Sequence, residues 1–189
     1  MKRFFLGLSC FTFVLFYGGL ACAQGLDRPL IVKSKYFSVY GERSINMYAV
    51  LKKLNFEYLI YAENLLTDKD DLGNMLAKSI DGLYMAVSDI LDIHIYNYHG
   101  KLMIFPDRAS LNEYLRQSYG LNLSERSYYF HKDNTIYISF ADLTAGVLGH
   151  EMGHAIVSLY FVVPPPVKVQ EILCGYVEYS LRRTPAVAP

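Results

Sequence analysis

Two histidines and a glutamate, His150, Glu151 and His154, lie within five consecutive residues of the chain. On an α-helix, residues four apart are offset by roughly 40° around the axis, so both histidines would point the same way, one turn apart. Two imidazoles placed like this can bind one metal ion. The carboxylate of Glu151 would then lie beside the position of a metal-bound water, where it could act as a general base.

A metal site that uses two histidines commonly takes a third protein ligand and leaves one position open. We call His150 to His154 the motif, and the helix expected to carry it the motif helix. Three consecutive prolines, Pro164 to Pro166, predict the end of this helix, and a second helix is expected over residues 167–182. This second helix carries Glu171 and Glu178, which lie two turns apart on nearly the same face. One glutamate could bind the metal while the other orients a histidine.

The motif and the downstream glutamates resemble those of the gluzincins, zinc peptidases whose third ligand is a Glu on a later helix. The segment Glu171-Ile-Leu-Cys-Gly-Tyr-Val-Glu178 is similar to Glu-Gly-Phe-Ala-Ser-Tyr-Val-Glu of the aminopeptidase N type family. The resemblance covers roughly residues 134–182, and the chain as a whole resembles the small peptidase MA-like proteins, or minigluzincins. It implies an α+β, zincin-like metallopeptidase domain with a small mixed sheet, an active-site helix and a downstream third-ligand helix.

On this resemblance, zinc would be bound by His150, His154 and Glu171, and Glu178 would be an orienting residue or an alternative ligand. Sixteen residues separate His154 from Glu171. That connector is shorter than those usual in the aminopeptidase N and thermolysin families, whereas ligation by Glu178 would make it longer than either. Larger gluzincins stabilise the oxyanion with a Tyr or His well after the third ligand. Here Tyr176 and His131 are the candidates, followed by Tyr128, Tyr129 and Tyr137.

The elements that must position these residues follow from hydrophobic periodicity and turn signals. In the N-terminal part, the sequence predicts a strand over 30–40, a helix over 45–66 capped by Ser44, and a helix over 72–91. A strand or hairpin over 93–98 and 102–105 follows, and then a helix that is capped by Asp107 or Ser110 and ends near Tyr119. Strands over 128–130 and 135–140, joined by a turn at 131–134, precede the motif helix, which runs from the N-cap Asp142 to Phe161.

The strand just before the motif helix has two interpretations. In zincins such a strand commonly forms the sheet edge along which an extended peptide substrate pairs, which makes Ile136–Ser139 the candidate edge. The alternative is an ordinary hairpin arm. His94 and His99 are expected to be strand or turn residues, and Cys174 a buried packing residue rather than a nucleophile.

The N-terminus has the three regions of a secretory signal peptide: Lys2-Arg3, an apolar run, and Ala21-Cys22-Ala23. Residues 1–23 are therefore predicted to be removed, and the chain exported to the periplasm or secreted. An uncleaved anchor and a lipoprotein modified at Cys22 are the alternatives. A single domain is expected over 24–183, with an N-terminal α/β part over 30–106, the edge strand and metal-binding helices over 127–183, and a disordered tail over 184–189.

Charge and cysteine content narrow the function classes. Removal of the signal would take away Lys2 and Arg3 and no acidic residue, which lowers the formal net charge from zero to −2. This balance gives no indication of nucleic-acid binding. Cys174 would be the one remaining cysteine, so an internal disulfide in a mature monomer is excluded, and no stable membrane span is expected after cleavage.

The expected function is zinc-dependent hydrolysis of a peptide or protein substrate, such as an envelope protein, through a metal-bound water activated by Glu151. The alternative is a non-catalytic envelope binding or assembly protein with a structural metal site. A third hypothesis is a peptidase that is active only within an assembly that supplies the oxyanion donor.

Overall fold

The computed structural model describes residues 28–54 and 72–183. Within these ranges the protein is α+β, with a small mixed sheet of five strands and five α-helices, as the sequence predicts. The predicted signal peptide, Cys22, residues 55–66 of the predicted first helix and the tail 184–189 lie outside the described residues.

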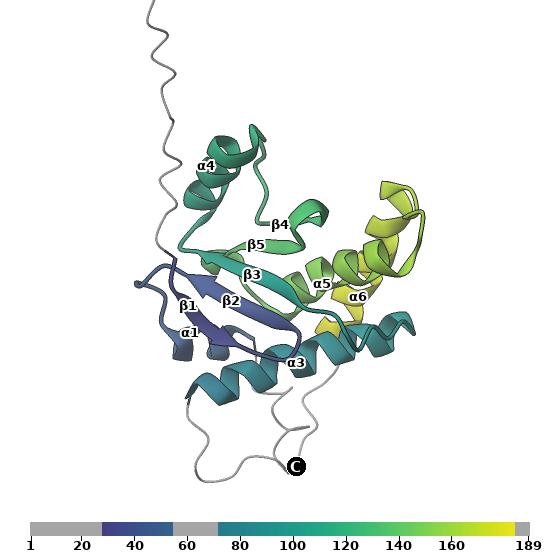
Figure 1. The fold of residues 1–189 in the computed structure, drawn as a ribbon, viewed down its shortest axis with the longest axis horizontal. Coiled ribbons are helices and arrows are strands. Elements are labelled where there is room, and N and C mark those ends of the chain that lie inside the picture. Colours follow the sequence, from purple (N-terminus) through teal and green to yellow (C-terminus); the bar gives the residue numbers. More distant parts are fainter. Residues whose placement is uncertain (1–27, 55–71, 184–189) are drawn as a thin grey trace, which may run out of the picture.

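The sheet consists of β1 (Leu30–Lys33), β2 (Phe37–Gly41), β3 (Gly100–Phe105), β4 (Ser127–Phe130) and β5 (Thr135–Ser139). Its strand order is β1-β2-β3-β5-β4 (Figure 1). The two central pairings, β2 with β3 and β3 with β5, are parallel, and the two outer pairings are antiparallel. Ile136–Ser139 therefore belongs to an inner strand, and its prediction as the sheet edge is wrong.

The five helices are α1 (Met47–Lys53), α3 (Leu72–Leu91), α4 (Arg108–Tyr119), α5 (Ala145–Tyr160) and α6 (Val167–Arg183). In Figure 1, α4 lies on one side of the sheet, whereas α1, α3, α5 and α6 lie on the other. Among these described helices, none combines the length and apolar character needed to cross a membrane.

The alternation of side chains along the strands creates the two apolar layers, because successive residues point to opposite faces of a sheet. In β3, Leu102 and Ile104 pack in the larger core with α3 and α5, whereas Phe105 packs in a smaller core beneath α4. In β5, Ile136 joins the larger core and Tyr137 the smaller one. Both faces of the central strands are thus buried.

Of the elements predicted before β4, some are confirmed and others are wrong. The helix over 72–91 is confirmed, and Asp107 caps α4 by accepting from the Ser110 amide. The single strand predicted over 30–40 is instead two antiparallel strands, because Ser34 makes a tight turn with Phe37. Asn46, not Ser44, caps α1, because its side chain accepts from the amides of the first turn. Residues 93–98 form an irregular segment with a turn at 96–97 rather than a strand.

Candidate metal centre

The motif helix α5 presents its histidines from a well-defined start. Thr144 is its N-cap, and the Thr144 hydroxyl accepts a hydrogen bond from the Val147 amide at 3.1 Å. The prediction of Asp142 as the cap is therefore wrong. The Asp142 carboxylate instead accepts from Arg108 Nε at 2.7 Å, which ties the entry of α5 to α4.

Helix α6 packs closely against α5 because small residues face it. A Cβ atom added at Gly153 would lie 3.1 Å from Cys174 Sγ and 3.6 Å from Cys174 Cα. A Cβ atom at Gly149 would lie 2.2 Å from Leu181 Cδ1. Cys174 is fully buried in this contact, as expected of a packing residue, and burial raises the pKa of its thiol. The close approach of the two helices places Glu171 next to the histidines.

The donor atoms of His150, His154 and Glu171 converge on one point. The two histidine Nε2 atoms lie 3.2 Å apart, and carboxylate oxygens of Glu171 lie 3.5 Å from His150 Nε2 and 3.3 Å from His154 Nε2. Tetrahedral zinc with bonds of about 2.0–2.1 Å places its ligand atoms about 3.3–3.4 Å apart. The three side chains therefore form a group that could hold a metal ion, and we call them the metal group. The distances between their donor atoms match those of a tetrahedral zinc site.

The outer nitrogens of the two histidines face further polar groups. His150 Nδ1 lies 3.4 Å from Glu178 Oε2, at ion-pair distance but without the geometry of a hydrogen bond. His154 Nδ1 lies 3.5 Å from Gln170 Oε1, and Gln170 in turn donates to the Pro165 carbonyl. Glu178 thus faces the Nδ1 side of His150, whereas Glu171 faces the Nε2 side. A carboxylate on the outer side of a metal-binding histidine typically orients the imidazole and does not bind the metal.

Glu178 is itself held between two arginines. Arg126, which directly precedes β4, donates to both carboxylate oxygens of Glu178 at 3.0 and 3.1 Å, and Arg182 pairs with it from the next turn of α6. The contact between Arg126 and Glu178 connects the start of the edge strand to α6, and so fixes the metal group relative to β4.

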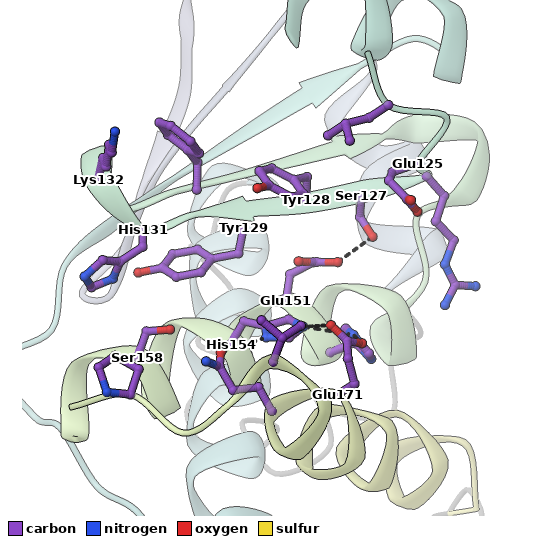
Figure 2. Close-up of a pocket in the computed structure, with 17 residues that line it drawn as sticks. Glu125, Ser127, Tyr128, Tyr129, His131, Lys132, Glu151, His154, Ser158 and Glu171 are labelled. Carbon is purple, nitrogen blue, oxygen red and sulfur yellow. Dashed lines mark hydrogen bonds and ion pairs between the residues drawn. The ribbon is translucent and has the colours of Figure 1, made fainter. Parts of the chain in front are cut away.

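Glu151 directly follows His150 on α5, and its side chain lies beneath β4 (Figure 2). Its side chain is buried, and Ser127 Oγ donates to Glu151 Oε1 at 2.7 Å. Burial raises the pKa of Glu151 to about 7, while the bonds from the Ser127 hydroxyl and the Tyr129 backbone act in the opposite direction. Burial also lowers the pKa of His154, against the attraction of Glu171, and so favours the neutral imidazole that binds metals.

A cavity of about 840 Å³ opens over these groups. Figure 2 shows Tyr128, Tyr129 and His131 along its β4 wall and Glu151, His154 and Glu171 opposite them. Within the described residues, β4 pairs with β5 alone, so its outer edge is unpaired. All four residues of β4 line this cavity. The edge strand beside the motif is therefore Ser127–Phe130.

The candidates for stabilising a transition state lie in different places. His131, Tyr128 and Tyr129 line the cavity. Tyr176 is 58% exposed on α6 and does not line the cavity. Tyr137 points to the opposite face of the sheet, where its hydroxyl lies 2.6 Å from the Tyr119 hydroxyl.

The two remaining histidines lie outside the metal group. His94 Nε2 lies 2.8 Å from an oxygen of Asp89. His99 lies 2.9 Å from both the Ser38 hydroxyl and the Lys35 carbonyl oxygen. Both lie in the irregular segment between α3 and β3, and neither belongs to the group that could hold a metal ion.

Three residues that contact the site were not singled out from the sequence: Ser127, Arg126 and Gln170. Ser127 and Tyr129 alternate along β4 and so share the face toward α5, but a lone Ser in a short strand carries no distinctive signal. Gln170 precedes Glu171 and Arg126 lies in a polar loop. Their roles depend on contacts between residues distant in sequence.

Comparisons of this chain with models of protein families, with curated proteins and with solved structures gave no match in any of the three.

Proposed function

We propose that this protein is a zinc-dependent peptidase in which His150, His154 and Glu171 bind the metal and Glu151 is the general base. The observation that carries the proposal is the arrangement of two imidazoles and a carboxylate, with donor atoms 3.2 to 3.5 Å apart, beside the buried Glu151. This set of nitrogen and oxygen donors is typical of catalytic zinc sites with three protein ligands.

Zinc bound by these residues would supply Lewis acidity, which polarises a peptide carbonyl and makes a water molecule more acidic. The chain supplies the proton transfers. Ser127 fixes the Glu151 carboxylate by its 2.7 Å hydrogen bond. Held in this position, Glu151 can take a proton from the attacking water and return it to the leaving amine.

The exposed edge of β4 supports a peptide as the substrate. An extended chain can add to such an edge through backbone hydrogen bonds, which are independent of the substrate's sequence. Together, an antiparallel edge strand, a motif helix and a downstream helix with a carboxylate agree with the zincin resemblance found in the sequence. If residues 1–23 act as a signal peptide, the substrates are proteins of the cell envelope or exterior.

The test compares wild type with Glu151→Gln and His154→Ala, for zinc content and for cleavage of an unfolded protein substrate. Wild type is expected to bind one zinc and cleave. Glu151→Gln should bind zinc without turnover, and His154→Ala should lose both properties. A wild type that holds no stoichiometric zinc after zinc addition, or a Glu151→Gln protein with undiminished cleavage, would contradict the proposal.

The second candidate is a non-catalytic envelope protein in which the metal is structural. The exposed position of Tyr176, away from the cavity, favours it, because one of the two expected transition-state stabilisers does not reach the site. A wild type that binds zinc tightly but cleaves no peptide, alone or with envelope extract added, would support this candidate and exclude activation by an assembly partner.

A further inference from the structure

The connection between α5 and α6 is an unusually apolar protrusion, at the right-hand edge of the molecule in Figure 1. From Ala155 to Val167 the chain carries no charged side chain. Val162 is fully exposed and Val163 is 81% exposed. The large apolar side chains at this tip are all solvent-exposed: Leu159, Tyr160, Phe161, Val162, Val163 and Val167.

The apolar surface continues from this tip along α6. Val169, Ile172, Tyr176 and Tyr179 are exposed, and their spacing of three and four residues places them in one stripe on the helix. Soluble domains rarely expose apolar surface of this extent unless it binds a partner or a membrane. The tip and the stripe, which we call the apolar face, are therefore a candidate binding surface.

The chemistry of the apolar face matches a lipid surface better than a protein groove. The tip projects from the molecule (Figure 1). Pro164 to Pro166 lack backbone N–H groups, so insertion of this turn into a membrane leaves fewer donors without partners. Tyr160, Tyr176 and Tyr179 combine an apolar ring with a polar hydroxyl, the combination enriched at membrane–water interfaces.

Basic residues lie at both ends of the stripe. Lys168 follows the tip directly, and Arg183 is the last residue of α6. Arg182, in the same turn, is already paired with Glu178. An apolar helix face flanked by cations is typical of helices that lie in the interface of an anionic membrane. The apolar face thus has both the hydrophobic and the charge character that such a surface selects.

We propose that the apolar face, formed by the tip at 159–167 and the outer stripe of α6, docks on an anionic lipid bilayer. The tip enters the interface and α6 lies along it. Pro164 and Val167 belong both to the tip and to the wall of the cavity, so docking brings the cavity to the membrane surface. If the proposed peptidase function holds, the preferred substrates are then peptide segments close to the bilayer.

The chain contains no tryptophan, so a single introduced indole reports on one position. The full-length Val163→Trp protein is mixed with phosphatidylethanolamine–phosphatidylglycerol vesicles whose acyl chains are brominated. The emission is expected to shift to shorter wavelength and to be quenched severalfold more than in Tyr48→Trp, whose site on α1 is also exposed. Each variant carries one indole, so its fluorescence reports on one position alone. Attachment to the vesicle through another segment of the chain would therefore not produce the difference in quenching between positions 163 and 48.

Adding Val162→Asp to the Val163→Trp protein is expected to abolish the shift while the far-ultraviolet spectrum stays unchanged, since this side chain packs against no core. Equal quenching at positions 48 and 163, or no change on vesicle addition, would overturn the proposal. So would a blue shift that grows with protein concentration without lipid, which would show that a second copy covers the face. Adding Glu151→Gln should leave the fluorescence unchanged, so this result and that of the peptidase test are independent.

Discussion

At the scale of single residues, burial of the Glu151 carboxyl lowers the stability of the metal-free fold when that carboxyl is charged. In the metal-free protein, its pKa of about 7 lies above the ordinary value of a glutamate because burial disfavours the charge. Glu151→Gln should therefore stabilise the metal-free fold by an amount that is absent near about pH 4, grows as pH rises between the two pKa values and reaches on the order of 1–3 kcal/mol above them.

Urea unfolding in the presence of a chelator, at several pH values, measures this difference. The matched control is Glu113→Gln, because the hydrogen bond from Arg116 lowers the pKa of that exposed carboxyl. Neutralising Glu113 should give no stabilisation at any pH. A gain for Glu151→Gln that is independent of pH would argue against burial of the charge as its cause.

The two glutamates of α6 should differ in their contribution to metal affinity. Glu178 faces His150 Nδ1, whereas Glu171 faces the Nε2 atoms of both histidines. Glu178→Gln is therefore expected to weaken zinc binding by about 10–100-fold, as loss of a carboxylate that orients a ligand does, and Glu171→Gln to weaken it more. Competition titration with a chromophoric chelator measures both. The reverse ranking would assign the ligand role to Glu178.

At the scale of elements, the contact between α5 and α6 decides whether the metal group forms. Gly153→Val should separate the helices, because the new side chain would meet the backbone and sulfur of Cys174. The separation moves Glu171 from the histidines, so zinc affinity and stability should both fall, the latter by about 1–3 kcal/mol as for other overpacked sites.

Gly175, on α6, is the matched control, because a Cβ atom there would meet no heavy atom within 4 Å. Gly175→Ala is expected to leave zinc affinity unchanged and to raise stability by up to about 1 kcal/mol through helix propensity. Isothermal titration and thermal unfolding of both variants check the pair. Unchanged zinc affinity in Gly153→Val would show that the helix contact does not position Glu171.

At the scale of the whole molecule, metal binding should stabilise the fold, because the proposed ligands come from two helices that separate on unfolding. Zinc at 100 times its dissociation constant should add about 2.7 kcal/mol. Wild type should therefore show a clear rise in Tm with zinc and its loss with a chelator. His154→Ala should show neither effect, and an equal zinc-dependent rise in that variant would place the stabilising metal elsewhere.

Features encoded by local pattern were predictable from the sequence. The helix over 72–91 is confirmed because its apolar residues recur at helical spacing, and the cap at Asp107 because its short carboxylate matches the amides of the first turn. The motif itself fixes that His150 and His154 share one side of a helix, since that follows from helical geometry alone.

Features that depend on long-range pairing were decided by the tertiary structure. Period-two patterning shows which residues share a face of a strand but not which strand is its neighbour. The sequence therefore allows Ile136–Ser139 to be either a sheet edge or a hairpin arm, and the structure makes it a hairpin arm with β4 at the edge. Similarly, the sequence allowed either Glu171 or Glu178 to face the metal group. Packing of α6 across the glycines of α5 set the rotation that turns Glu171 to the Nε2 atoms and Glu178 to the other side of His150.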